Sequence, residues 1–187
     1  MHIGILALQG AFIEHAKMLD KLQVTHHEIR NKADLGLHMD GIILPGGEST
    51  AIYKMLVELD MLSVLKEKIE NGLPAFGTCA GLILLARQTS NNGSANIGTM
   101  EIVVKRNAYG RQLGSFFAEA EVKGIGTFPM VFIRAPYIES VGDSVDVLAS
   151  VDGKIVACRQ DSQLGTAFHP ELTDNDKFHR LFIEMCK

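Results

Sequence analysis

The pentapeptide Gly77-Thr78-Cys79-Ala80-Gly81 decides how this chain is organised. The apolar run before it, residues 73–76, is typical of a buried strand, and residues 82–87 after it predict a helix. Glycines two residues before and two residues after the cysteine suit a turn too sharp for larger side chains. Such a turn holds a thiol at the carboxyl end of a strand and the amino end of a helix, where thiolate is favoured. We predict that Cys79 is a nucleophile, the alternative being a small buried hydrophobic residue.

Strands and helices alternate on both sides of this turn. Apolar runs predict strands at 3–8, 24–29, 41–44 and 164–168, and helical spacing predicts helices at 12–22, 52–59, 62–69 and 178–185. We expect Ser49 or Thr50 to cap the second of these helices, and Thr173 or Asp174 to cap the last. This alternation predicts a parallel sheet covered by helices on both faces.

The middle of the chain has a different pattern. Residues 90–96 are polar and predict a loop, and turns rich in glycine, proline and aspartate separate short strand candidates at 102–104, 116–122, 130–133, 145–151 and 154–158. We interpret these as an antiparallel extension together with later strands of the main sheet. The predicted fold class is α/β, a doubly wound, mostly parallel sheet flanked by helices with a small antiparallel extension, in one domain spanning 1–187.

Composition narrows the classes of function. The chain has 187 residues, 47% of them hydrophobic, and a net charge of −4, so neither a nucleic-acid partner nor a membrane span is expected. The amino terminus resembles a first strand rather than a signal peptide, which favours a cytoplasmic protein. Cys79, Cys158 and Cys186 are odd in number and lack metal-like spacing. We therefore expect no disulfide framework, no metal and no cofactor.

A thiol nucleophile needs a base, and the base needs an orienting group. His169 follows the last predicted strand, at the sheet edge where Cys79 also lies, and Pro170 restricts the direction of Glu171. We predict a Cys79-His169-Glu171 triad, the alternative being a strand-ending turn with a surface carboxylate. Of the other histidines, we expect His26, His27 and His38 to be solvated or structural. We expect His2, His15 and His179, at a terminus or on helix faces, to be solvated.

An oxyanion hole would complete the site. In enzymes with this kind of turn one donor is the backbone N–H after the nucleophile, here that of Ala80, and another comes from a loop after a neighbouring strand. Gly46 and Gly47 follow the strand at 41–44, and glycine lets the backbone approach a substrate. The alternative is a glycine pair that serves only chain reversal.

Taken together, these motifs resemble class I glutamine amidotransferases, and within them the glutaminase subunits of pyridoxal 5′-phosphate synthases. The segments that carry the resemblance span nearly the whole chain: 8–10, 44–50, 77–82, 106–107, 132–136 and 168–173. The resemblance implies that glutamine is hydrolysed to glutamate and ammonia through a thioester on Cys79, with His169 as acid and base and Glu171 orienting it. It further implies an oxyanion hole at Gly47 and Ala80, and a glutamine site lined by Gly46, Gly47, Glu48, Arg106, Ile133 and Arg134. Which arginine binds the substrate carboxylate stays open.

The same resemblance implies a protein partner. The chain has no Walker loop and no second domain that could consume ammonia. We expect a separate synthase protein, forming a ring decorated by glutaminase subunits, which receives the ammonia internally. We also expect weak glutaminase activity before docking, with the 46–47 peptide reorienting on docking.

Three other interpretations fit parts of the same pattern. A γ-glutamyl hydrolase or a cysteine peptidase on the same scaffold would need no partner. A redox-sensing or chaperone-like protein would usually carry an acidic residue near the end of the first strand, where this chain has Gln9. An inactive protein with only a partner role is disfavoured by the intact triad.

Overall fold

The computed structural model describes residues 1–90, 95–106 and 114–187. It is an α/β fold with one ten-stranded sheet and a separate two-stranded sheet. The strands are β1 (His2–Leu6), β2 (Thr25–Ile29), β3 (Gly41–Leu44), β4 (Ala75–Thr78), β5 (Ala86–Thr89), β6 (Met100–Lys105), β7 (Ser115–Val122), β8 (Gly126–Ile133), β9 (Tyr137–Val141), β10 (Asp146–Val151), β11 (Lys154–Gln160) and β12 (Gln163–Thr166). The helices are α1 (Phe12–Lys21), α2 (Lys32–Leu35), α3 (Ser49–Glu58), α4 (Leu62–Glu70), α5 (Ala80–Leu85), the 3₁₀ helix η1 (Pro170–Leu172) and α6 (Lys177–Met185).

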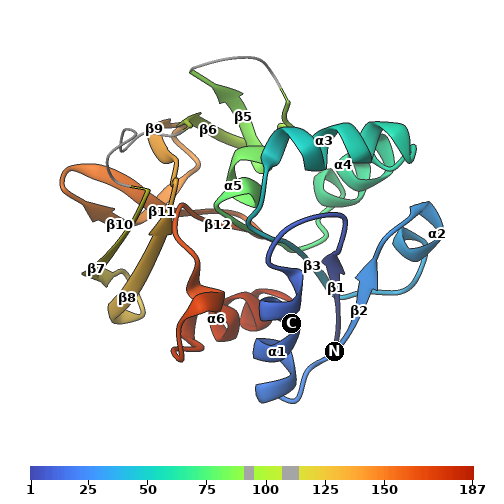
Figure 1. Cartoon of the computed structure of the whole chain (residues 1–187), viewed down its shortest axis with the longest axis horizontal. Coiled ribbons are helices and arrows are strands. Elements are labelled where there is room, and N and C mark those ends of the chain that lie inside the picture. Colours follow the sequence, from blue (N-terminus) through green and yellow to red (C-terminus); the bar gives the residue numbers. More distant parts are fainter. Residues whose placement is uncertain (91–94, 107–113) are drawn as a thin grey trace.

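The centre of the sheet is five parallel strands in the order β2-β1-β3-β4-β12. Strands β3, β4 and β12 are buried along their whole length, because helices cover both faces. Figure 1 shows α1 and α6 on one side of these strands and α3, α4 and α5 on the other. The predicted doubly wound, mostly parallel sheet is confirmed. Parallel neighbours end at the same edge, so the segments that follow β3, β4 and β12 meet there.

The remaining strands extend the sheet with mixed directions. Strands β11, β9 and β6 pair antiparallel, β5 pairs parallel with β6, and β10 pairs with β11. The separate antiparallel sheet, β7 with β8, is the predicted small extension. Alternate residues of β8 are buried, and the ring of Phe128 contacts those of Phe168 and Phe178. This contact fixes the extension beside the last strand and the last helix.

The structure differs from the sequence-based expectations at several local features. The helix predicted at 82–87 ends at Leu85, because the chain turns at Ala86 into β5. Strand β9 and the single-turn helix α2 were not predicted, although Asn31 gives α2 a capping box. Neither proposed cap forms: α3 begins at Ser49 itself, and α6 begins at Lys177 without a side-chain cap. Part of the loop predicted at 90–96, residues 91–94, lies outside the described residues.

Within the described residues, none of the helices is long and apolar enough to span a membrane.

Candidate active site

Cys79 occupies the sharp turn between β4 and α5. Its backbone is in the left-handed region, with φ 47° and ψ −94°, which is uncommon for a residue with a side chain. The flanking glycines are required by space: a Cβ on Gly77 would lie 2.6 Å from the carbonyl carbon of Gly81, and one on Gly81 would lie 1.9 Å from the Leu44 carbonyl oxygen. The turn therefore combines stored strain with close packing, and this brings the thiol to the edge of the sheet.

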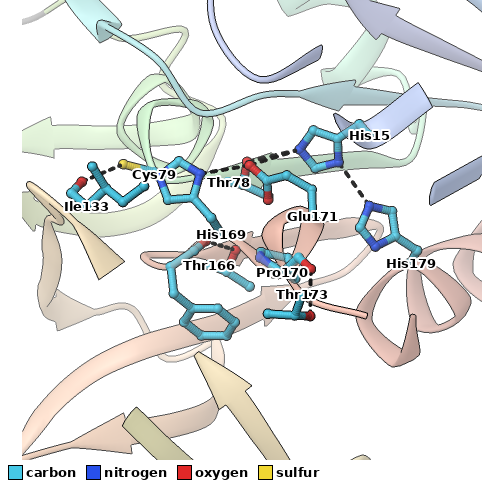
Figure 2. Close-up of polar contacts among 11 residues, drawn as sticks. His15, Thr78, Cys79, Ile133, Thr166, His169, Pro170, Glu171, Thr173 and His179 are labelled. Carbon is cyan, nitrogen blue, oxygen red and sulfur yellow. Dashed lines mark hydrogen bonds and ion pairs between the residues drawn. The ribbon is translucent and has the colours of Figure 1, made fainter. Parts of the chain in front are cut away.

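His169 and Glu171 come to the same edge from the neighbouring strand. Strand β12 pairs parallel with β4, Thr166 beside Thr78, so the residues that follow each strand lie close together. Nδ1 of His169 lies 2.7 Å from Oε1 of Glu171, and η1 begins at Pro170 between them. Figure 2 shows the imidazole between the Cys79 thiol and the Glu171 carboxylate. The three predicted triad residues are therefore adjacent, and each is only 6% exposed.

The electrostatics of the triad favour a charged imidazole. Burial would lower the pKa of His169, but hydrogen bonds with Cys79 and Glu171 outweigh it and raise that pKa to about 10. Burial would raise the pKa of Glu171, yet contacts with His15 and His169 bring it below its usual value. A carboxylate and an imidazolium are the forms that a thiolate mechanism needs.

The loop after β3 packs directly against the triad. A Cβ on Gly46 would lie 2.2 Å from Cε1 of His169, so only glycine fits beside the imidazole. The Gly46 carbonyl accepts a hydrogen bond of 2.9 Å from the N–H of Ala11. The Gln9 side chain restrains the next residues: its Oε1 accepts a 2.7 Å hydrogen bond from the Glu48 N–H and would lie 2.5 Å from a Cβ on Gly47. The loop is thus adjacent to the triad, as predicted.

The predicted glutamine-binding residues outside this loop differ in how they are connected to the site. The Ile133 carbonyl accepts a 3.9 Å hydrogen bond from the Cys79 thiol, which brings the end of β8 to the site. Arg106 follows β6 and pairs with Glu48 at 3.0 Å, so it belongs to the loop after β3. Arg134 is exposed and has a φ of 44°. Asn107, part of the motif at 106–107, lies outside the described residues.

Two histidines were assigned wrongly from the sequence. His15 on α1 and His179 on α6 are fully buried rather than solvated. Nδ1 of His15 lies 2.9 Å from Nε2 of His179, and Nε2 of His15 lies 3.2 Å from the Thr78 hydroxyl. Nε2 of His15 is also 3.6 Å from Oε1 of Glu171. The two histidines therefore lie on the side of Glu171 that faces away from Cys79 (Figure 2). Helical periodicity could have found them, since both positions fall on the apolar faces of their helices.

The other cysteines belong to other elements: Cys158 lies in β11, and Cys186 directly follows α6. Cys158 is fully buried, and burial raises the pKa of its thiol to about 12. All three cysteines are free. The described residues contain no group of three or more histidine, cysteine, aspartate or glutamate side chains that could hold a metal ion.

Comparisons with known proteins agree on one family. Residues 5–187 match the sequence model of the SNO glutamine amidotransferase family. A Haemophilus influenzae (strain PittEE) protein named pyridoxal 5′-phosphate synthase subunit PdxT is 57% identical over all of this chain and 99% of its own length. A protein of the same name from Streptococcus pneumoniae (strain CGSP14) is 57% identical over all of this chain and 98% of its own length.

Solved structures give the same picture. A crystal structure described as a glutamine amidotransferase superposes with a TM-score of 0.94 at 42% identity, covering 98% of both chains. A glutamine amidotransferase from Thermotoga maritima superposes with a TM-score of 0.64 at 12% identity, covering 98% of this chain and 83% of its own, which is a likeness of fold.

Proposed function

The chain belongs to the SNO glutamine amidotransferase family, and we propose that it is the glutaminase subunit of a pyridoxal 5′-phosphate synthase, hydrolysing glutamine with Cys79, His169 and Glu171. The observation that carries this proposal is the adjacency of a strained, turn-borne thiol to an imidazole that is itself hydrogen-bonded to a buried carboxylate. Such an arrangement has the parts that acyl transfer requires.

The reaction begins with the Cys79 thiolate and the His169 imidazolium. The sulfur attacks the carboxamide carbon of glutamine, and the carbonyl oxygen becomes an oxyanion. His169 then gives its proton to the nitrogen, the C–N bond breaks, and ammonia leaves a glutamyl thioester on Cys79. Water attacks the thioester as His169 takes its proton, which releases glutamate and restores the thiolate. Glu171 orients the imidazole throughout.

Backbone groups beside Cys79 stabilise the oxyanion. The donors in this proposal are the N–H groups of Ala80, the first residue of α5, and of Gly47. The contact of Gly46 with His169 supports this role for the loop, because it sets the loop and the triad side by side. Glutamine would then bind among the loop residues Gly46, Gly47 and Glu48, with Arg106, Ile133 and Arg134 around it.

A partner protein receives the ammonia. Relatives that match the whole chain are named as subunits of pyridoxal 5′-phosphate synthase, which supports a partner that carries out the synthase reaction. Ammonia released into water at neutral pH would be protonated and lost as a nucleophile, so direct transfer to the partner is favoured. A ring-shaped partner and a cytoplasmic location stay predictions.

Glutamate release from glutamine tests the proposal. The purified chain is tested alone and with the candidate synthase subunit, for both the wild type and Cys79→Ala. We expect activity that rises when the partner is present and disappears in the variant. No glutamate release under either condition, from a chain whose Cys79 is still readily alkylated, would contradict the proposal.

A further inference from the structure

A buried hydrogen-bonded chain runs from α6 through α1 to the triad carboxylate. His179 and His15 are both fully buried, and their rings contact each other and the ring of Phe76 edge-on or tilted. The hydroxyl of Thr78, the residue before the nucleophile, lies 3.2 Å from Nε2 of His15 and 3.5 Å from Oε1 of Glu171. The triad mechanism described above does not use His15, His179 or Thr78.

The direction of each hydrogen bond follows from the carboxylate. Ionised Glu171 can only accept, so the Thr78 O–H donates to it. The hydroxyl oxygen then accepts from Nε2–H of His15, and in a neutral imidazole this leaves Nδ1 of His15 as an acceptor. That acceptor is satisfied by Nε2–H of His179. In this arrangement all three protons point toward Glu171, and each neutral histidine carries its proton on Nε2.

The surroundings of the two histidines fit this neutral state. Burial lowers the pKa of His15, and burial together with the neighbouring His15 lowers that of His179 to about 3. The charged or titratable groups that face His15 are Glu171, His169, His179 and Glu14, and those that face His179 are His15, Glu171 and Asp176.

The carboxylate is restrained on one side only. Oε1 of Glu171 accepts from His169 at 2.7 Å and from Thr78, whereas the buried Oε2 has no hydrogen-bond partner among the described residues. If the contact on Oε1 weakens, no hydrogen bond to Oε2 opposes rotation of the carboxylate. The orientation of His169 depends on that carboxylate, so a change at His15 reaches the nucleophile through Thr78, Glu171 and His169.

We propose that His15 is a positioning residue of the glutaminase: through the Thr78 hydroxyl it holds Oε1 of Glu171 against His169, and His179 fixes the His15 tautomer that this requires. This inference deepens the proposed function and rests on it for the kinetic readout. The readout of Cys79 reactivity does not depend on the substrate.

The kinetic test compares His15→Leu with His15→Gln in the complex with the synthase subunit. Leucine removes the donor to Thr78, whereas the glutamine amide can supply one at the place of Nε2. We expect His15→Leu to lower kcat about tenfold or more with little change in KM, as misplacement of a triad member does. His15→Gln should recover most of the loss, and His38→Leu, at an exposed histidine, should behave as wild type.

The second readout is the pH profile of Cys79 alkylation by iodoacetamide in the chain alone. We expect its midpoint to shift upward in His15→Leu and to return toward the wild-type value in His15→Gln. A wild-type profile in His15→Leu, or equal losses in both variants, would overturn the proposal. If the wild type hydrolyses no glutamine, but the two variants still show these shifts in the alkylation profile, the proposed function is refuted and the positioning role of His15 is supported.

Thr78 keeps the test decisive if His15→Leu does not fold. Thr78→Val keeps the shape and removes the hydroxyl, and Thr78→Ser restores it. We expect the loss in Thr78→Val and its recovery in Thr78→Ser; no loss in a folded Thr78→Val would overturn the proposal. NMR chemical shifts of the imidazole nitrogens, measured on nitrogen-labelled wild type, give a direct check. The proposal requires the Nε2–H tautomer for both His15 and His179. The other tautomer at either residue would overturn it.

Discussion

Gly46 and His169 approach so closely that a single added carbon atom would overlap the imidazole, at 2.2 Å from Cε1. Gly46 follows β3 and His169 follows β12, two strands separated in the sheet by β4, which carries the nucleophile. The three loops therefore converge on one point, and glycine at position 46 serves the placement of the base as well as the turn of the chain.

Gly46→Ala should displace His169 and strongly reduce glutaminase activity. The new methyl group has no room unless the ring or the loop moves, and a base displaced by about 1 Å costs on the order of a hundredfold in rate. Activity in the complex with the synthase subunit is the measurement. Gly36→Ala is the matched control, because the added carbon there meets only the Ala33 carbonyl at 3.1 Å, far from the triad. Wild-type rates in Gly46→Ala would show that the loop and imidazole separate during turnover.

The strained backbone of Cys79 predicts that a residue with a side chain at this position lowers the free energy of unfolding. Cys79→Gly relieves the left-handed φ of 47°, whereas Cys79→Ala keeps it, and both remove the thiol. We expect the free energy of unfolding of Cys79→Gly to exceed that of Cys79→Ala by about 1 kcal/mol. Urea unfolding of the two inactive variants measures this difference. An alanine variant at least as stable as the glycine variant would show that the turn is unstrained.

The central sheet was predictable because its strands are continuous apolar runs that only a doubly covered parallel sheet buries. Strand β3 was predicted to the residue at Gly41–Leu44. The strands at the edge of the sheet were harder to predict from the sequence. Strand β5 carries Arg87 and Gln88, both exposed, so its sequence continues the helical pattern and gives no strand signal. The caps failed for a similar reason, because capping residues near a helix start do not fix which of them begins it.

The triad was predictable because its residues stand in short motifs at the ends of strands. The histidines behind it were not recognised, because a histidine on a helix face is more often solvated than buried. Tertiary packing buries His15 and His179, because α1 and α6 lie on the same face of the sheet (Figure 1). This brings the two rings into contact with each other and with Phe76. Only the packing of helices from opposite ends of the chain reveals that contact.

The two buried histidines predict a loss of stability in mild acid. Their pKa values are lowered on folding, so the unfolded chain binds more protons than the folded chain once the pH falls below about 6.5. The stability that these neutral histidines contribute is therefore fully present above that pH. It is lost progressively as the pH falls toward the folded-state pKa of His179, about 3.

Replacing one of these histidines should flatten this dependence. We expect His179→Gln to reduce the slope of unfolding free energy against pH, between about 4 and 6, by up to ~1.4 kcal/mol per unit. Denaturant unfolding at several pH values measures the slope, and the exposed His38→Gln should reproduce that of the wild type. An unchanged slope in His179→Gln would mean that His179 is already protonated in the folded state.

The two candidate arginines should differ in their effect on glutamine binding. Arg106 is paired with Glu48 at 3.0 Å, whereas the exposed Arg134 makes no ion pair with any residue that the structure describes. An uncommitted guanidinium is the better partner for a substrate carboxylate. We expect Arg134→Ala to raise KM for glutamine by about 10- to 100-fold, the worth of a charged hydrogen bond, and Arg106→Ala to raise it less. The reverse order would assign the carboxylate to Arg106.

The hydrogen bond between Ala11 and Gly46 predicts how docking could control activity. The Gly46 carbonyl accepts from the Ala11 N–H at 2.9 Å, and in a trans peptide the Gly47 N–H points the opposite way. If docking of the synthase subunit turns this peptide over, the Ala11 hydrogen bond has to break. The φ of Ala11, −84°, lies near the range of proline, so Ala11→Pro can remove the donor without forcing the backbone far from its present course.

Ala11→Pro should therefore raise the glutaminase activity of the chain measured without the synthase subunit. The proline ring takes the place of the N–H and crowds the Gly46 carbonyl, which destabilises the present orientation of the peptide. Ala11→Ser keeps the N–H and is the matched control, expected to need the partner as the wild type does. The measurement is the ratio of glutamate release with and without the synthase subunit. If that ratio is the same in the proline and serine variants, the Ala11 hydrogen bond is not the restraint that docking releases, and reorientation of the 46–47 peptide loses its structural support.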